Sequence, residues 1–234
     1  NSITYCLNSA NLELSNIDAI VFYEKPFIKF ERLLETYLQK VPFGFSSFKI
    51  AIPLWTKEKL FQRQLILKHL FSIEKNSTLK DKLFFTDHHH SHAASAFYPS
   101  PFNDATILTL DGVGEWATTS TGVGSAQRIE LHKSIDYPHS LGLLYSAFTY
   151  HTGFKVNSGE YKLMGLAPYG EPVFADIIRE HLIDIKDDGS YRLNTEYFGY
   201  LDGLRMTNEK FDELFGGPPR KPESRITVRE MDLA

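Results

Sequence analysis

Four histidines lie within five consecutive residues of this sequence, in the segment 88–92 that follows Asp87. If the segment is helical, His88 and His92 project from one face one turn apart, which is the spacing of two metal ligands. Neutral imidazoles suit zinc or iron, and the Asp87 carboxylate could hold one ring's second nitrogen and fix its tautomer. His89 and His92 form an alternative pair. Surface or capping histidines are the alternative without a metal.

Two imidazoles require at least one further ligand from another element, and Asp111 is the expected donor. It ends a predicted strand, where its side chain projects beyond the sheet edge. Gly112 and Gly114 leave room for a ligand to approach the backbone. A plain Asp-Gly hairpin turn is the structural alternative. A strand, an Asp-Gly pair and a Thr-rich return strand are also how actin-like folds bind phosphate.

A glycine-spaced segment, GEYKLMGLAPYG at 159–170, is the candidate nucleotide site. It has neither P-loop nor dinucleotide-fingerprint spacing. Glycines such as Gly165 let backbone amides approach an anion, while Lys162 and Glu160 could pair with phosphate and ribose hydroxyls respectively. In the alternative reading, Gly165 terminates a helix and Lys162 faces solvent.

Composition excludes several classes of function. The chain has 234 residues, 42% of them hydrophobic, and 25 Lys plus Arg against 29 Asp plus Glu give a net charge of −4. This charge argues against nucleic acid as the main partner. Cys6 is the only cysteine and no GxSxG is present, so covalent catalysis is not expected. We also expect no membrane span and a cytoplasmic location.

Hydrophobic periodicity predicts the elements that position these residues. Strands are expected at 19–23, 82–85, 105–110, 115–122 and 128–134, and a polar segment with turns at 184–200. Helices are expected at 28–40, from a Thr56 N-cap to 71, at 88–97 capped by Asp87, from a Ser140 N-cap to Gly153, and at 173–182 and 208–215. The alternation of strands and helices predicts an α/β fold with a mixed sheet.

Three long strings, TDHHHSHAASAFYPSPF (86–102), LDGVGEWA (110–117) and GEYKLMGLAPYG (159–170), resemble the NodU/CmcH family of O-carbamoyltransferases. The resemblance extends to FYEKP (22–26) and YPHSLGLLY (137–145). It implies the actin-like ATPase/sugar kinase superfamily (ribonuclease H-like), with a mixed sheet, flanking helices and a fold that is incomplete in this chain. Residues 1–234 would then be part of an N-terminal metal- and nucleotide-binding carbamoyl-transfer domain. The C-terminal adenylate-forming domain is expected outside this chain.

The resemblance also implies the chemistry. Carbamoyl-adenylate, made from carbamoyl phosphate and ATP, would donate its carbamoyl group to a hydroxyl of a small-molecule or glycan acceptor. Iron(II), or another divalent metal, would be held by His88, His92 and Asp111, with a further Asp expected beyond Ala234. Residues 1–20 do not match the family's segment with the His base, so turnover by this chain alone is not expected.

Two rival functions remain open from the residues. In a metal-dependent hydrolase, the same imidazoles activate water and Glu115 serves as the base, although no HExxH signature is present. A non-catalytic module that binds nucleotide or a partner is the second rival.

Overall fold

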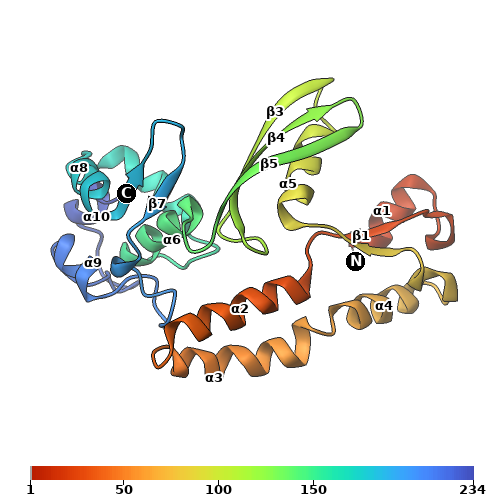
Figure 1. The fold of residues 1–234 in the computed structure, drawn as a ribbon, viewed down its shortest axis with the longest axis horizontal. Coiled ribbons are helices and arrows are strands. Elements are labelled where there is room, and N and C mark those ends of the chain that lie inside the picture. Colours follow the sequence, from red (N-terminus) through yellow and green to blue (C-terminus); the bar gives the residue numbers. More distant parts are fainter. Residues whose placement is uncertain (1) are drawn as a thin grey trace.

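The structure is a computed structural model that describes residues 2–234, with helices and strands arranged as Figure 1 shows. The helices are α1 (Ser2–Ala10), α2 (Pro26–Lys40), α3 (Phe45–Leu54), α4 (Gln62–Ile73), α5 (His88–Phe97), α6 (Leu141–His151), α7 (Glu160–Leu166), α8 (Ala175–Ile177), α9 (Glu209–Leu214) and α10 (Val228–Asp232). The strands are β1 (Ile20–Phe22), β2 (Leu83–Phe85), β3 (Asp104–Leu110), β4 (Ala117–Ser125), β5 (Arg128–Asp136), β6 (Ile183–Ile185) and β7 (Tyr191–Leu193).

The α/β composition is confirmed, but the strands of residues 2–234 form three sheets instead of one mixed sheet. β1 and β2 pair in parallel, β3, β4 and β5 form an antiparallel meander, and β6 pairs with β7. β1 and β2 offer only three residue pairs to each other. The chain turns back from β3 into β4 through the loop that carries Asp111. This short connection favours an antiparallel pairing of neighbouring strands over the parallel pairing that a mixed sheet would need.

Helix α5 packs on the β3–β5 sheet, as Figure 1 shows. Ala93 and Phe97 form a small core with Ile107 of β3 and Ile129 of β5. The Phe97 ring lies over Gly124 of β4, where an added Cβ would come within 2.6 Å of the ring. This close approach fixes the C-terminal end of α5 on the sheet.

The largest core lies on the other side of the sheet and is built around α6. Ala147 and Phe148 of α6 pack with Leu163 of α7 and with the fully buried Phe211 and Phe215. Ser140 caps α6 as predicted, with its Oγ accepting the Leu143 N–H at 3.0 Å, and Gly153 ends the helix at a φ of 81°. The β6–β7 hairpin adds Leu193 to this core, within a segment predicted to be polar turns.

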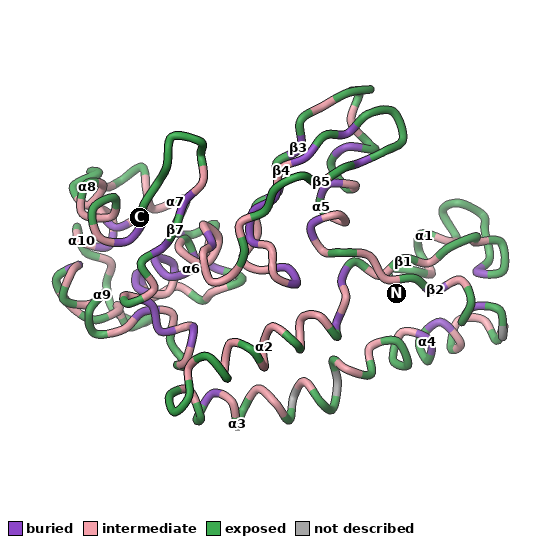
Figure 2. The backbone as a smooth tube through the Cα atoms, in the orientation of Figure 1, coloured by how far each residue is buried: buried purple, intermediate pink, exposed green. Residues whose placement is uncertain are grey.

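Helices α2 and α3 form an antiparallel pair that extends below the β3–β5 sheet and towards the α6 core in Figure 1. Figure 2 shows that few residues of this pair are buried. The predicted helix start at Thr56 is wrong. Residues Phe45–Leu54 are already helical, and Thr56 Oγ1 donates to Ile52 O at 2.9 Å instead of capping a new helix. A Pro53 inside the helix masked this continuity in the sequence. Within residues 2–234, no helix is long and apolar enough to cross a bilayer.

Candidate metal centre

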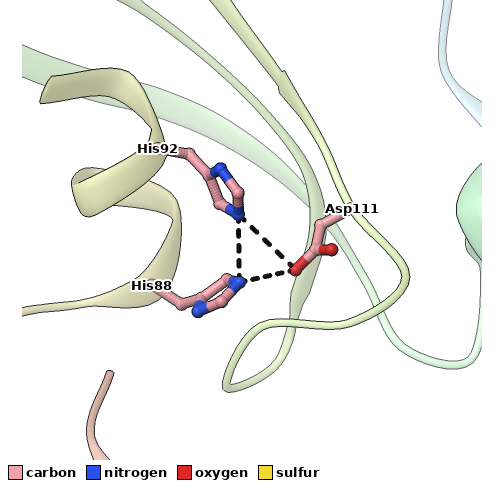
Figure 3. Close-up of side chains that lie close together, drawn as sticks. All are labelled: His88, His92 and Asp111. Atoms are coloured by element: carbon pink, nitrogen blue, oxygen red, sulfur yellow. Dashed lines mark hydrogen bonds and ion pairs between the residues drawn. The ribbon is translucent and has the colours of Figure 1, made fainter. Parts of the chain in front are cut away.

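The structure brings His88, His92 and Asp111 together, as Figure 3 shows. His88 Nε2 lies 2.8 Å from Asp111 Oδ2 and 3.0 Å from His92 Nε2, and His92 Nε2 lies 3.9 Å from the same carboxylate oxygen. Helical periodicity places the two rings on one face of α5, and the end of β3 brings the carboxylate to them. That these residues bind a metal stays a prediction.

These three donors fit a divalent cation. A cation about 2.1 Å from each nitrogen or oxygen keeps adjacent ligand atoms about 3.0–3.4 Å apart. The three distances of 2.8, 3.0 and 3.9 Å bracket that range. Two imidazole nitrogens directed at one another and at a carboxylate oxygen also match the donor types of zinc and iron sites. The His92 side chain is 49% exposed, against 14% for His88, so the cluster is accessible from the His92 side.

The Asp111 loop is held from behind by the start of α6. Ser140 Oγ lies 3.0 Å from the Asp111 carbonyl oxygen, and a Cβ at Gly142 would come within 2.6 Å of that oxygen. The Gly112 N–H donates to Asp111 Oδ1 at 2.7 Å, which leaves Oδ2 facing the imidazoles. The hydrogen bond from His88 lowers the pKa of Asp111 to about 2, although partial burial raises it. The carboxylate is therefore ionised at neutral pH.

Glu115 caps α5, and the predicted Asp87 cap is wrong. Glu115 is 9% exposed, and its Oε2 accepts the His88 N–H at 2.9 Å while Oε1 accepts the Lys25 N–H at 2.7 Å. Asp87 makes no side-chain cap and instead pairs with Lys25 Nζ at 2.8 Å. Glu115 therefore joins the loop after β3 to the N-termini of α2 and α5. Its two main-chain contacts and its burial give Glu115 a structural role in holding this loop.

Arg32 of α2 fixes the same loop from the opposite side. Its Nη1 lies 2.7 Å from the carbonyl oxygens of both Gly114 and Glu115, and its guanidinium lies over the Tyr137 ring at 5.3 Å. Burial lowers the pKa of Arg32 from its ordinary value, but a guanidinium remains charged at neutral pH.

The alternative ligand pair of His89 and His92 does not form. His89 is 3% exposed, and its Nδ1 lies 2.7 Å from Ser120 Oγ and 2.9 Å from Thr109 Oγ1 on the sheet. Burial lowers the pKa of His89, which favours the neutral ring. His89 therefore packs α5 on the sheet.

Gly112 and Gly114 flank the site in different ways. A Cβ at Gly114 would lie 3.1 Å from His89 Cδ2 and 3.3 Å from His88 Cβ, so this glycine is needed for the loop to approach α5. A Cβ at Gly112 would meet only Leu143 Cδ2, at 4.0 Å. The backbone at Gly112 is thus the less crowded of the two.

The predicted nucleotide segment forms helix α7. Glu160 Oε1 accepts Asn157 N–H at 2.8 Å and Ser146 Oγ–H at 3.1 Å, while Oε2 accepts Gly159 N–H at 3.1 Å. Partial burial raises the pKa of Glu160, but these hydrogen bonds outweigh it and lower the pKa below its ordinary value.

The contact with α6 ties Glu160 to the helix that supports Asp111. Ser146 and Ser140 are about 9 Å apart along the α6 axis, at 1.5 Å per residue. Lys162 and Gly165 are exposed on α7, and Gly165 lies inside the helix instead of ending it.

Sequence reasoning missed Glu115 as an anchor and missed Arg32 altogether. Their contacts join positions 27 to 90 residues apart, which periodicity does not detect. The one sequence feature that could have indicated Glu115 is its position in the same glycine-containing loop as Asp111.

An α/β chain with two imidazoles and a carboxylate at a strand end defines a candidate metal-binding protein. The chain matches the family described as "Carbamoyltransferase N-terminus" over residues 1–231, and it belongs to that family.

Three relatives illustrate the family. The chain is 58% identical to a Synechocystis sp. protein described as uncharacterized, over 99% of this chain and 38% of that protein. It is 34% identical to nodulation protein NolNO of Sinorhizobium fredii, over 88% of this chain and 27% of NolNO. It is also 34% identical to nodulation protein NolO of Bradyrhizobium diazoefficiens, over 48% of this chain and 20% of NolO. The chain thus spans less than half the length of these relatives.

Proposed function

We propose that this chain is the metal- and nucleotide-binding part of an O-carbamoyltransferase. The protein would transfer a carbamoyl group from carbamoyl-adenylate, made from carbamoyl phosphate and ATP, to a hydroxyl of a small-molecule or glycan acceptor. Membership of the carbamoyltransferase family supports the reaction class. The observation that carries the proposal is the convergence of His88, His92 and Asp111 on one point.

In this proposal His88, His92 and Asp111 hold iron(II) or another divalent cation. When bound, the cation stabilises negative charge that develops on the carbamoyl or phosphate oxygens. The protein's own contribution is positioning. Ser140 and Arg32 hold the loop that carries Asp111, and Glu115 ties that loop to the N-terminus of α5. The actin-like fold and the division into transfer and adenylate-forming domains are part of the same proposal.

The nucleotide would lie between the Asp111 loop and α7. The less crowded backbone at Gly112 is proposed to approach its phosphates, as in actin-like folds, while Gly114 allows the loop to pack closely on α5. A carboxylate has about four lone-pair sites, and Glu160 Oε2 uses one of its two for Gly159. This leaves one acceptor position for a ribose hydroxyl. Lys162 and Gly165 would complete the site from α7.

The proposed transfer step changes no oxidation state and needs no redox partner. The acceptor hydroxyl oxygen bonds to the carbamoyl carbon, the acyl–phosphate bond breaks, and AMP leaves. The hydroxyl proton passes to a general base. Bringing the acyl group and the hydroxyl together in one orientation supplies much of the rate enhancement.

The test uses the full-length protein with ATP, carbamoyl phosphate and a panel of sugar and small-molecule alcohols. Carbamoylated product and AMP should form together, only with an acceptor, and be lost in His88→Ala. A hydrolase would release AMP at the same rate without acceptor, and a binding module would leave the nucleotide intact. Either result contradicts the proposal.

A further inference from the structure

His88 has a second ring nitrogen that faces away from the ligand cluster. This Nδ1 is buried and has no hydrogen-bond partner within residues 2–234, although Nε2 on the same ring contacts Asp111. A buried polar atom without a hydrogen-bond partner is unfavourable, so each such atom in a folded protein needs an explanation. A neutral imidazole that gives Nε2 to a metal carries its proton on Nδ1. The metal-bound ring therefore needs an acceptor at this position.

The carboxylate of Glu24 lies beside that nitrogen. Glu24 is 7% exposed, and its Oε2 is 3.8 Å from His88 Nδ1. Lys29 Nζ contacts the same Oε2 at 2.5 Å, which holds the carboxylate in place and balances its charge. The Tyr23 ring lies beside the His88 ring, with the centroids 5.7 Å apart and the planes tilted by 59°. Tyr23 and Glu24, which follow β1, thus place an aromatic ring and a carboxylate beside the side of His88 that faces away from Asp111.

We propose that Glu24 is the positioning residue that orients His88 for metal binding. Its carboxylate accepts the Nδ1–H, which keeps Nε2 unprotonated and directed at the cation. A distance of 3.8 Å is longer than a hydrogen bond, so a shift of about 1 Å between the ring and the carboxylate would be needed to form one. The inference rests on the metal site proposed above and adds a residue to it.

The sequence pattern pointed to Asp87 for this role, but the structure favours Glu24. The Asp87 side chain is 58% exposed and pairs with Lys25 Nζ at 2.8 Å. Glu24 is buried and paired with a cation that neutralises it. A carboxylate on the outer nitrogen raises the basicity of a ligating imidazole and fixes its orientation, and its loss typically lowers metal affinity about 10–100-fold.

The experiment measures Zn²⁺ and Co²⁺ binding to the metal-free full-length protein. Glu24→Ala, Glu24→Gln and the control Glu31→Gln, an exposed residue of α2, are titrated by calorimetry. Thermal unfolding of each metal-free variant checks the fold. The Zn²⁺ dissociation constant should rise about 10–100-fold in Glu24→Ala and by less in Glu24→Gln, whose amide oxygen still accepts a hydrogen bond. Glu31→Gln should match the parent protein.

The Co²⁺ absorption spectrum separates ligand orientation from simple packing, because its bands respond to coordination geometry. We expect it to change in Glu24→Ala and to recover partly in Glu24→Gln. Dissociation constants within twofold of the parent in both variants, with unchanged Co²⁺ spectra, would overturn the inference while leaving the metal site intact. Zn²⁺ binding that is unaffected by His92→Ala would instead overturn the metal site itself, and this inference with it.

Discussion

Single residues decide how closely the Asp111 loop approaches α5. Gly114 is buried against His88 and His89, whereas Gly112 faces open space apart from Leu143. His88 and Asp111 are therefore held at their spacing partly by the absence of a side chain at Gly114. Glycine is favoured at position 114 by this contact and not by an unusual backbone angle.

Gly114→Ala should destabilise the protein and weaken metal binding together. The new Cβ would lie 3.1 Å from His89 Cδ2 and 3.2 Å from Ala117 O, so these neighbours must give way by a few tenths of an ångström. Overpacking of this kind costs about 1–3 kcal/mol. Urea unfolding and Zn²⁺ titration measure the two effects. Gly112→Ala is the matched control, and equal stability of the two variants would argue against the steric account.

At this scale the sequence was informative about residues that share a helix face or end a strand. His88 and His92 follow from helical periodicity, and Asp111 follows from its place after a strand. Glu115 and Arg32 did not follow, because their partners lie far along the chain. Local sequence patterns therefore indicated the candidate ligands more readily than Glu115 and Arg32, which hold the loop in place.

Helix α5 is the element on which the site depends, and it is fixed at both ends. Phe97 packs over Gly124 at its C-terminus, and Glu115 accepts the His88 N–H at its N-terminus. His88 is the first residue of the helix and contacts Glu115 directly, and His92 follows one turn later. Losing that N-terminal anchor should therefore affect the site more than losing a surface contact nearby.

Glu115→Ala should lower the free energy of unfolding by about 2–4 kcal/mol, because two main-chain N–H groups lose a charged acceptor. Asp87→Ala is the control, since it removes one partly exposed ion pair worth at most about 1 kcal/mol. Chemical denaturation of both variants measures the difference. A larger loss in Asp87→Ala would restore Asp87 as the helix cap.

Element boundaries were predicted best where apolar periodicity and caps agree. The 28–40 helix, the 82–85 strand and the Ser140-capped helix closely match α2, β2 and α6. Helix α3 was missed because Pro53 and the hydroxyl of Thr56 resemble a break and a cap. The β6–β7 hairpin was missed because its short strands lie in a segment, 184–192, that is mostly charged and polar.

On the scale of the whole molecule, the α6 core contains a buried ionisable ring that the site does not use. His151 is fully buried, with its ring 4.9 Å from that of Phe211. Its Nδ1 lies 3.6 Å from Asp212 Oδ1, beyond hydrogen-bond distance. Burial lowers the pKa of His151 to about 4, and the nearby Arg229 acts in the same direction, opposed by Glu230.

This burial makes the stability of the fold depend on pH. An unfolded histidine titrates near pH ~6.5, so as the pH falls the unfolded chain binds the proton first. The contribution of His151 is complete above about pH 6.5 and is lost progressively towards pH 4. Between pH 7 and 5 the loss is about 2 kcal/mol. His151→Leu should reduce the fall in unfolding free energy by that amount, measured by urea titration. If the unfolding free energies of the parent protein and His151→Leu fall equally between pH 7 and 5, His151 is not the source of this pH dependence.

Global pairing was the feature least accessible from the sequence. Strands β1 to β5 were predicted, but the division of the strands into three sheets depends on contacts between distant segments. The chain covers 38% of the Synechocystis relative and 27% of NolNO, so the complete reaction involves parts of the protein outside this chain in the proposed function. The proposed carbamoyl donor and acceptor concern the whole protein, whereas His88, His92 and Asp111 all lie within the described residues.

The central claim is that His88, His92 and Asp111 hold one divalent cation. The most direct measurement is the metal content and Zn²⁺ affinity of the full-length protein and of His92→Ala, with His90→Ala as a control from the same histidine run. We expect one bound metal in the parent protein and in His90→Ala, and loss of that metal in His92→Ala with the fold retained. Equal metal content in His92→Ala and the parent protein would contradict the claim.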